Sequence, residues 1–226
     1  MLKIENAKIV GWEEVVRGMR NPMNSWSKSD SGWDSDYFNT TDYDSRLYVD
    51  HDSDDLYFLG PNDANLMMKL RNAGTDHRKF MRMITVYMDI TAPLYWWKEY
   101  DTYKVGTVAN SCSTMHKISA KEFTLDDFSH EHLQEDSIAV LESVIHTLNV
   151  HREWFNNDAA DDSKIDWWQM IQLLPSSYNQ LRTVMLNYEV LANMYKSRKN
   201  HKLDEWRTFC ECVKTFPYSE LITGKE

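Results

Sequence analysis

The stretch EYDTYKVGTVANSCSTMH, residues 99–116, gathers side chains that could act on a small polar ligand. It places hydroxyl, amide and thiol groups close together and carries little apolar bulk. A core strand would need more apolar side chains, and a random linker would be less ordered in composition. We therefore expect a polar segment that holds something other than the protein core.

Cys112 is the candidate nucleophile of this segment, with His116 as the nearest base in the sequence. A reactive cysteine needs a neighbouring base or cation that activates the thiol, and a bystander thiol fits this composition better. Cys210 and Cys212 lie two residues apart in a predicted helix and therefore point in different directions. We interpret both as packing residues.

A carboxylate and a histidine, Glu142 and His146, share one face of a predicted helix. A carboxylate-bridged metal site would need a second helix with a matching pair, and the later helices carry no histidine at that spacing. We expect solvated side chains here and no metal site. The common dinucleotide, phosphate-loop, zinc-protease and hydrolase motifs are also missing from the sequence.

The strongest local positive charge lies between two predicted helices near the C-terminus. Its bases are Lys196, Arg198, Lys199, His201, Lys202 and Arg207. Such a patch attracts anions, but bases also gather at helix C-termini to offset the macrodipole. The sequence leaves both interpretations open.

Composition excludes several classes of protein. The 226 residues are 42% hydrophobic and carry a net charge of −10, so a polynucleotide should be repelled, whereas one nucleotide needs only a small basic site. The sequence has no apolar run of membrane-spanning length, and its first ten residues lack the layout of a signal peptide. The sequence has only three cysteines, so we do not expect a disulfide framework. We expect a cytoplasmic protein.

The hydrophobic pattern predicts an α+β fold in a single domain over residues 1–226, with a helix-rich C-terminal half. The elements predicted for the first half are an edge strand at 2–10, a helix from Trp12, a helix at 60–74, a strand at 83–90, an aromatic helix capped by Thr91, and an extended segment at 104–109. From about Leu125 the pattern predicts helices to the end, the third of them over 175–198.

Residues 30–63 form a segment rich in aspartate and aromatic side chains. It holds ten Asp, no Glu and a single Lys or Arg, Arg46. Disordered segments are poor in aromatics, so the segment is interpreted as an ordered or ligand-ordered insertion, with a solvated surface loop as the plainer alternative.

Four landmarks together resemble the flavin-dependent thymidylate synthases, the ThyX family, over roughly residues 66–217. They are His77 after NAGTD, then ITVYMDITAPLYWWKEYDTYK, then LLPSSYNQLRTVMLNYEVLANMYKSR, and finally HKLDEWRTFCECVKTFP. The polar segment described first takes the place of the family signature, which cradles flavin and the deoxyuridylate phosphate. Small hydroxyl and amide groups suit that task because they allow donors to approach phosphate oxygens closely.

The resemblance implies methylation of dUMP to dTMP by a homotetramer, with FAD as cofactor and with NADPH and methylenetetrahydrofolate as co-substrates. It implies that Arg198 is catalytic, because it matches an arginine that polarises the pyrimidine. The cofactor-binding residues that it implies are His77, Lys104, Asn187, Asn193 and Lys202. The substrate-binding residues that it implies are Glu99, Thr107, Asn110, Ser111, Cys112 and Ser113.

The chain departs from the family pattern at its most charged motif. Where the family has Arg-His-Arg, this chain has Thr102-Tyr103-Lys104, and two polar residues of the family's last helix become Lys202 and Asp204. Charge could come instead from Lys104, Arg182, Lys199 and Lys202. Two other interpretations therefore stay open: a related enzyme that modifies another pyrimidine nucleotide, for example by hydroxymethylation, and a non-catalytic nucleotide-binding oligomer.

Overall fold

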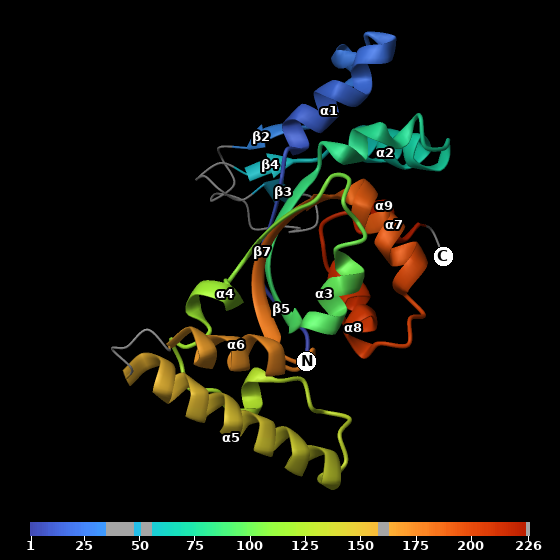
Figure 1. Ribbon diagram of the computed structural model, residues 1–226. Helices are drawn as coiled ribbons and strands as arrows, with labels where there is room; N and C mark the ends of the chain where they lie inside the picture. Colours follow the sequence, from blue (N-terminus) through green and yellow to red (C-terminus); the bar gives the residue numbers. More distant parts are fainter. Residues whose placement is uncertain (35–47, 51–55, 158–162, 225–226) are drawn as a thin grey trace. The chain divides into compact units, whose positions relative to one another are not determined.

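The computed structural model of the chain describes residues 1–34, 48–50, 56–157 and 163–224 (Figure 1). Its contacts divide the chain into two compact units. The first unit contains Met1–Lys3, Asp89–Thr102 and Ala109–Thr183. The second unit contains Ile4–Met88, Tyr103–Val108 and Val184–Glu226. The expectation of a single domain stays a prediction.

Four strands form the larger sheet, in the order β1-β5-β7-β6. Their bounds are β1 (Lys3–Val10), β5 (Thr85–Pro93), β7 (Asn179–Asn187) and β6 (Val108–Ser111). The edge position of β1 and the strand character of β5 confirm the sequence predictions. In β5 the side chains of Val86, Met88 and Ile90 are buried while Tyr87 is exposed, which is the alternation of a strand with one covered face.

The helix predicted over 175–198 is wrong in its first half, because that half is strand β7. Gln180, Val184 and Leu186 are buried at even spacing along it, and Leu181 and Thr183 between them are exposed. This period of two belongs to a strand. Asn187 then ends the strand in an extended conformation and caps helix α7 (Tyr188–Arg198).

The second unit is built around α7. Most side chains of α7 from Tyr188 to Tyr195 are buried, among them Leu191 and Met194. The helices and 3₁₀ segments packed in this unit are α1 (Trp12–Arg20), η1 (Asn21–Met23), η2 (Trp26–Lys28), α2 (Pro61–Asn72), η5 (Arg78–Arg82), α8 (Asp204–Val213) and α9 (Glu220–Thr223). Helix α7 contacts η5, α8 and α9, and η5 contacts α2. The predicted helices at residue 12, at 60–74 and at the C-terminus are confirmed.

The insertion at residues 30–63 contributes a second, antiparallel sheet of order β2-β4-β3. Its strands are β2 (Gly32–Asp34), β3 (Tyr48–Asp50) and β4 (Leu56–Phe58). The remainder of the insertion, residues 35–47 and 51–55, lies outside the described residues.

The first unit carries the long helical hairpin of the molecule, in which α5 (Glu135–Asn157) packs along α6 (Ser163–Leu173). Phe123, Phe128, Leu148 and Met170 form the centre of its core. The shorter elements are α3 (Leu94–Tyr100), α4 (Thr114–Lys117) and η6 (Leu125–Asp127). No helix in the part of the chain that the structure describes is long and apolar enough to span a bilayer.

Two boundaries in this region differ from the predictions. Helix α3 begins at Leu94, and Thr91 stays in strand β5. The amides of Leu94 and Tyr95 donate to the carbonyls of Tyr178 and Ser176, both at 3.0 Å, so the helix start is satisfied by a distant segment and needs no side-chain cap. The segment predicted as extended over 104–109 becomes a strand only from Val108.

A buried carboxylate fastens the insertion to α2. Asp63 is fully buried and accepts hydrogen bonds from Arg20 Nε at 2.6 Å, from the hydroxyls of Ser29 and Ser31 at 2.7 Å each, and from the Asp30 amide at 3.1 Å. Asp30 in turn accepts from the amides of Asn62 and Asp63 at the start of α2. Both ends of the insertion are therefore held by one hydrogen-bond network.

This network sets the ionisation of Asp63. Burial by itself would raise the pKa of its carboxyl, but the hydrogen bonds from Ser29, Ser31 and Arg20 outweigh burial and hold the pKa below its usual range. A depressed pKa stabilises the fold above the unfolded value of about 3.9, and this stabilisation is lost as the pH falls below it.

We predict that Asp63→Asn lowers the free energy of unfolding by about 3 kcal/mol at about pH 7, because it leaves the buried Arg20 guanidinium without its anion. Urea unfolding followed by tryptophan fluorescence measures this value, with the exposed Asp126→Asn as the control. The difference between wild type and Asp63→Asn should be smaller at about pH 3 than at about pH 7, because the carboxyl of the unfolded chain, with a pKa of about 3.9, is protonated there and folding has to remove that proton. An equal difference at both pH values would contradict the proposed ionisation.

Candidate functional site

The guanidinium of Arg198, at the C-terminal end of α7, is held by two aromatic side chains of the same unit. Its Nε donates a hydrogen bond to the Tyr103 hydroxyl at 3.0 Å. Its Cζ lies 4.9 Å from the centroid of the Trp206 ring and 5.7 Å from that of the Tyr103 ring. A guanidinium fixed over aromatic faces presents its donors in a defined plane. We call these three residues the Arg198 cluster.

The turn that carries Tyr103 packs against the start of α7. Gly106 has φ +77°, and a Cβ placed on it would lie 2.9 Å from Asn187 Nδ2. The Thr107 hydroxyl donates to the Tyr103 carbonyl and closes the turn. Asn187 Oδ1 accepts from the Val190 amide at 3.1 Å, which caps α7. Three residues predicted from the resemblance, Arg198, Asn187 and Thr107, are thus brought to the same turn.

The donors around this turn fit a flavin nucleotide, which is a planar ring joined to an anionic diphosphate. Arg198 supplies a guanidinium, and Lys104 and Lys202 are exposed cations. The glycine at position 106 leaves the turn without a side chain where it meets Asn187. Guanidinium, ammonium and amide groups are the usual partners of phosphate oxygens.

Two other predicted cofactor residues, His77 and Asn193, flank Arg78. His77 is exposed and stands immediately before η5. Asn193 Oδ1 accepts from Arg78 Nη2 at 3.4 Å, and Arg78 Nε donates to Glu189 Oε1 at 3.3 Å. Asn193 lies five residues before Arg198 on α7, so the two side chains leave the helix on different faces.

The remaining predicted substrate residues belong to the first unit. Glu99 is half-buried on α3, and Asn110, Ser111 and Cys112 are exposed in and after β6. Ser113 is half-buried, and its hydroxyl accepts from the His116 amide at 3.1 Å, which caps the short helix α4. In the structure Ser113 therefore acts as the N-cap residue of α4.

A chain of hydrogen bonds positions the backbone of Cys112 in this unit. The Cys112 amide donates to the Leu181 carbonyl at 2.9 Å, and the Cys112 carbonyl accepts from Gln180 Nε2 at 2.9 Å. Gln180 Oε1 accepts from Arg182 Nε at 3.0 Å. Arg182 also donates to Asp101 at 2.9 Å and stacks 4.2 Å from the centre of the Trp97 ring. Arg182, which the sequence suggested as a possible source of positive charge, is engaged within this hydrogen-bond network.

The basic patch predicted near the C-terminus separates into three groups. Arg198 belongs to the cluster described above. Lys196 and Lys199 line a cavity with residues of α2 and η5. Arg207, in the first turn of α8, donates to the carbonyls of His201 at 2.7 Å and Lys202 at 3.1 Å and pairs with Asp204. It therefore stabilises the local turn before α8.

Cys210 and Cys212 are placed as packing residues would be. Burial raises the pKa of the Cys210 thiol to about 11 and also raises that of Cys212. Thiols in such surroundings stay protonated at neutral pH and are poor nucleophiles. Among the described residues, no group of three or more His, Cys, Asp or Glu side chains could hold a metal ion.

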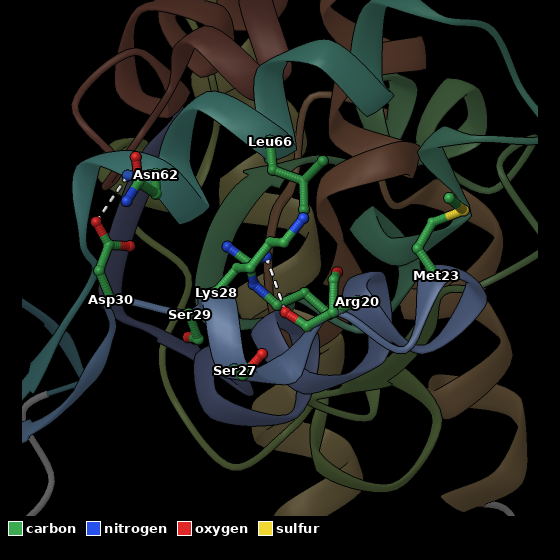
Figure 2. Close-up of a pocket in the computed structure, with 9 residues that line it drawn as sticks. Arg20, Met23, Ser27, Lys28, Ser29, Asp30, Asn62 and Leu66 are labelled. Atoms are coloured by element: carbon green, nitrogen blue, oxygen red, sulfur yellow. Dashed lines mark hydrogen bonds between the residues drawn. The ribbon is translucent and has the colours of Figure 1, made fainter.

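A larger cavity of about 770 Å³ lies beside the network of Asp63 (Figure 2). Its lining includes Arg20, Lys28, Ser29, Asp30, Asn62 and Leu66. Arg20 donates to Asp63 and to the Ser25 carbonyl. Asp30 accepts from the Asn62 amide, which Figure 2 marks with a dashed line. Arg20 and Asp30 are engaged in holding the insertion, so we do not place the functional site here.

The sequence assigned no role of their own to Tyr103 and Trp206. Tyr103 stands at the position where the family has histidine. This exchange of one hydrogen-bonding ring for another was the feature of the sequence that could have indicated a role for Tyr103. Trp206 is fully buried in α8 and carries only the pattern of a core residue. Its contact with Arg198 depends on how α7 and α8 pack.

No protein-family model matches the sequence, and no curated protein matches it. Solved structures do. The flavin-dependent thymidylate synthase ThyX from Helicobacter pylori, complexed with FAD and dUMP, aligns with a TM-score of 0.64 at 13% identity over 97% of this chain and 98% of that one. A second ThyX structure from that organism, with FAD and dUMP, aligns with a TM-score of 0.63 at 13% identity over 99% and 98%.

The UMP/dUMP methylase PolB from Streptomyces cacaoi, bound with 5-Br dUMP, aligns with a TM-score of 0.54 at 13% identity over 99% of this chain and 94% of that one. The chain therefore has the ThyX fold, which confirms the predicted α+β class. The low identity limits the comparison to the fold.

We predict that Gly106→Ala lowers the free energy of unfolding by about 2 kcal/mol, because alanine is strained at positive φ and its Cβ would press on the Asn187 cap. Chemical denaturation measures the change. The control is Gly32→Ala, where a Cβ would meet nothing within 4 Å. In an Asn187→Ala background the cost of Gly106→Ala should fall, and a cost that stays the same would show that the two residues are not coupled.

Proposed function

We propose that this chain, which has the fold of flavin-dependent thymidylate synthases, transfers a one-carbon unit to C5 of dUMP and forms dTMP. The observation that carries the proposal is the Arg198 guanidinium, fixed by Tyr103 and Trp206 at the end of α7. Two structures with this fold hold FAD and dUMP, and a third is a UMP/dUMP methylase. Methylenetetrahydrofolate is the proposed carbon donor.

Arg198 is the proposed catalytic residue. C5 of a uracil ring becomes nucleophilic when negative charge is stabilised on a ring carbonyl oxygen. A guanidinium held in one plane can donate to such a developing oxyanion without reorganising during the reaction. Tyr103 and Trp206 fix that plane from two directions, so Tyr103 is the proposed positioning residue.

FAD is the proposed cofactor, and when bound it supplies the hydride that reduces the transferred carbon. His77, Lys104, Asn187, Asn193 and Lys202 would hold it. Glu99, Thr107, Asn110, Ser111, Cys112 and Ser113 are the proposed contacts of the nucleotide. NADPH would restore the reduced flavin, and a homotetramer is the proposed assembly.

The exchange of Arg-His-Arg for Thr102-Tyr103-Lys104 favours one alternative, a nucleotide-binding oligomer without catalysis. Titration with FAD and with dUMP, separately and together, decides between the two. Bound flavin gives a yellow protein that absorbs at about 450 nm. A protein that binds dUMP and not FAD would establish the alternative, and the mass of the product separates methylation from hydroxymethylation.

We predict that Arg198→Ala lowers kcat for dUMP by about 10²-fold or more, because a fixed donor to the transition state is lost. FAD affinity should change by less than about threefold, since the proposed partner of Arg198 is the pyrimidine. Product formation and flavin absorbance measure the two effects. The matched control is Arg207→Ala, a nearby exposed arginine whose contacts are local. Unchanged turnover in Arg198→Ala would remove this residue from the mechanism.

We predict that Tyr103→Phe lowers kcat by about tenfold with little change in KM for dUMP, because it keeps the ring and removes only the acceptor that orients Arg198. Steady-state kinetics separate the two parameters. Tyr103→His, which restores a hydrogen-bonding ring, should recover part of kcat. Equal kcat values for Tyr103→Phe and wild type would show that the hydroxyl does not position the guanidinium.

A further inference from the structure

A small cavity of the second unit is lined by four separate segments, three of which contribute positively charged side chains. Its volume is about 170 Å³. Arg71 comes from α2, Arg78 from η5, Asn193, Lys196 and Lys199 from α7 and its end, and Thr223 from α9. Among the described residues, no carboxylate lines it. We call this cavity the basic pocket.

The two arginines of the basic pocket are held in place by the protein. Arg71 Nε donates to the Leu221 carbonyl at 3.1 Å and Nη2 to the Ile222 carbonyl at 3.5 Å. Arg78 Nε and Nη2 donate to Glu189 and Asn193. Their side chains are therefore ordered before any ligand arrives, which reduces the entropy lost on binding.

The charges in the basic pocket are not balanced. Glu189 faces both Arg78 and Arg82, so one carboxylate serves two guanidiniums. Burial lowers the pKa of Arg71, and the positive charge of Arg78 lowers it further. Like charges that repel in the folded protein gain from an anion placed between them. Such a local excess of positive charge is unusual in a chain with a net charge of −10.

Helix capping accounts for only part of the arrangement. Lys196 lies in the last turn of α7 and Lys199 is its C-cap residue, where cations offset the helix macrodipole. Arg71 and Arg78 belong to other elements, α2 and η5, so their presence in the pocket is not explained as capping of α7 by its own residues. Ala192, Lys196 and Lys199 follow the spacing of one helix face, and Arg198 leaves the helix on another.

We infer that the basic pocket binds a phosphate or diphosphate group, separately from the contacts of the Arg198 cluster. Arginine forks recognise tetrahedral oxyanions through paired hydrogen bonds, and lysines add charge. Whole-ligand pockets usually measure about 300–1,000 Å³, so a cavity of about 170 Å³ suits an oxyanion group and not an entire nucleotide. The group could belong to FAD or to dUMP, and both share this chemistry.

Isothermal titration calorimetry with inorganic pyrophosphate tests the inference, because this probe needs neither flavin nor catalysis. Wild type should bind it saturably at low ionic strength, and the binding should weaken as salt screens the charges. Lys196→Gln/Lys199→Gln should lose affinity by about tenfold or more, since each charge-assisted contact contributes about that factor. Both lysines are exposed, so the fold should be retained.

The matched control is Lys98→Gln/Lys164→Gln, which removes the same charge from exposed helix positions of the first unit. It should bind pyrophosphate like wild type. Arg78→Lys, which keeps the charge and loses the planar fork, should weaken binding as well. Absence of saturable binding in wild type, or equal losses in the test and control variants, would overturn the inference.

Titrations with FAD and dUMP identify the source of the group. A loss of FAD affinity in Lys196→Gln/Lys199→Gln assigns the pocket to the flavin diphosphate, and a loss of dUMP affinity assigns it to the nucleotide phosphate. The inference is independent of the proposed reaction. A protein that binds pyrophosphate here but never forms dTMP would keep the pocket and contradict only the proposed function.

Discussion

Helix α7 is packed between η5, α8 and α9, and its burial determines where the positive charges of the second unit lie. A helix enclosed in this way cannot rotate about its axis, because any rotation would expose buried apolar side chains such as Leu191 and Met194. Its polar side chains therefore leave at fixed positions. Arg198 meets the turn of Tyr103, and Lys196 and Lys199 meet the arginines of α2 and η5.

Both ends of α7 are tied to segments that are far away in the sequence. At the N-terminal end, Asn187 caps the helix and touches the turn at Gly106. At the C-terminal end, Arg198 donates to Tyr103 in the same turn. One short turn thus contacts the first and the last residue of the helix region. A change in that turn should therefore displace the guanidinium, because the segment Thr102-Tyr103-Lys104 and Arg198 are joined by this hydrogen bond.

The cations of the Arg198 cluster and the basic pocket are exceptions in a chain that is acidic overall. A net charge of −10 disfavours anions at long range. An anionic ligand, such as the proposed nucleotide, would therefore have to be attracted over short distances, where fixed guanidiniums and ammonium groups outweigh the distant carboxylates. The Arg198 cluster and the basic pocket both meet this requirement by ordering their cations before binding. Elsewhere, the cations Arg20 and Arg182 are engaged with Asp63 and Asp101 and serve the fold.

The sequence by itself determined the elements whose pattern is local. The period of α1, the Pro61 start of α2 and the alternation in β5 each follow from side chains within one element. It misassigned β7, because the segment before α7 mixes apolar and polar residues in a way that suits either structure until its neighbours β5 and β6 are known. The proposed role of Arg198 came from the resemblance and not from a local pattern. Only the tertiary structure decided the partners: the Tyr103 hydroxyl lies 95 residues from Arg198 in the chain, and Arg71 meets Lys199 only because α2 and α7 both pack on η5. Such contacts depend on packing between distant segments, which no local periodicity encodes.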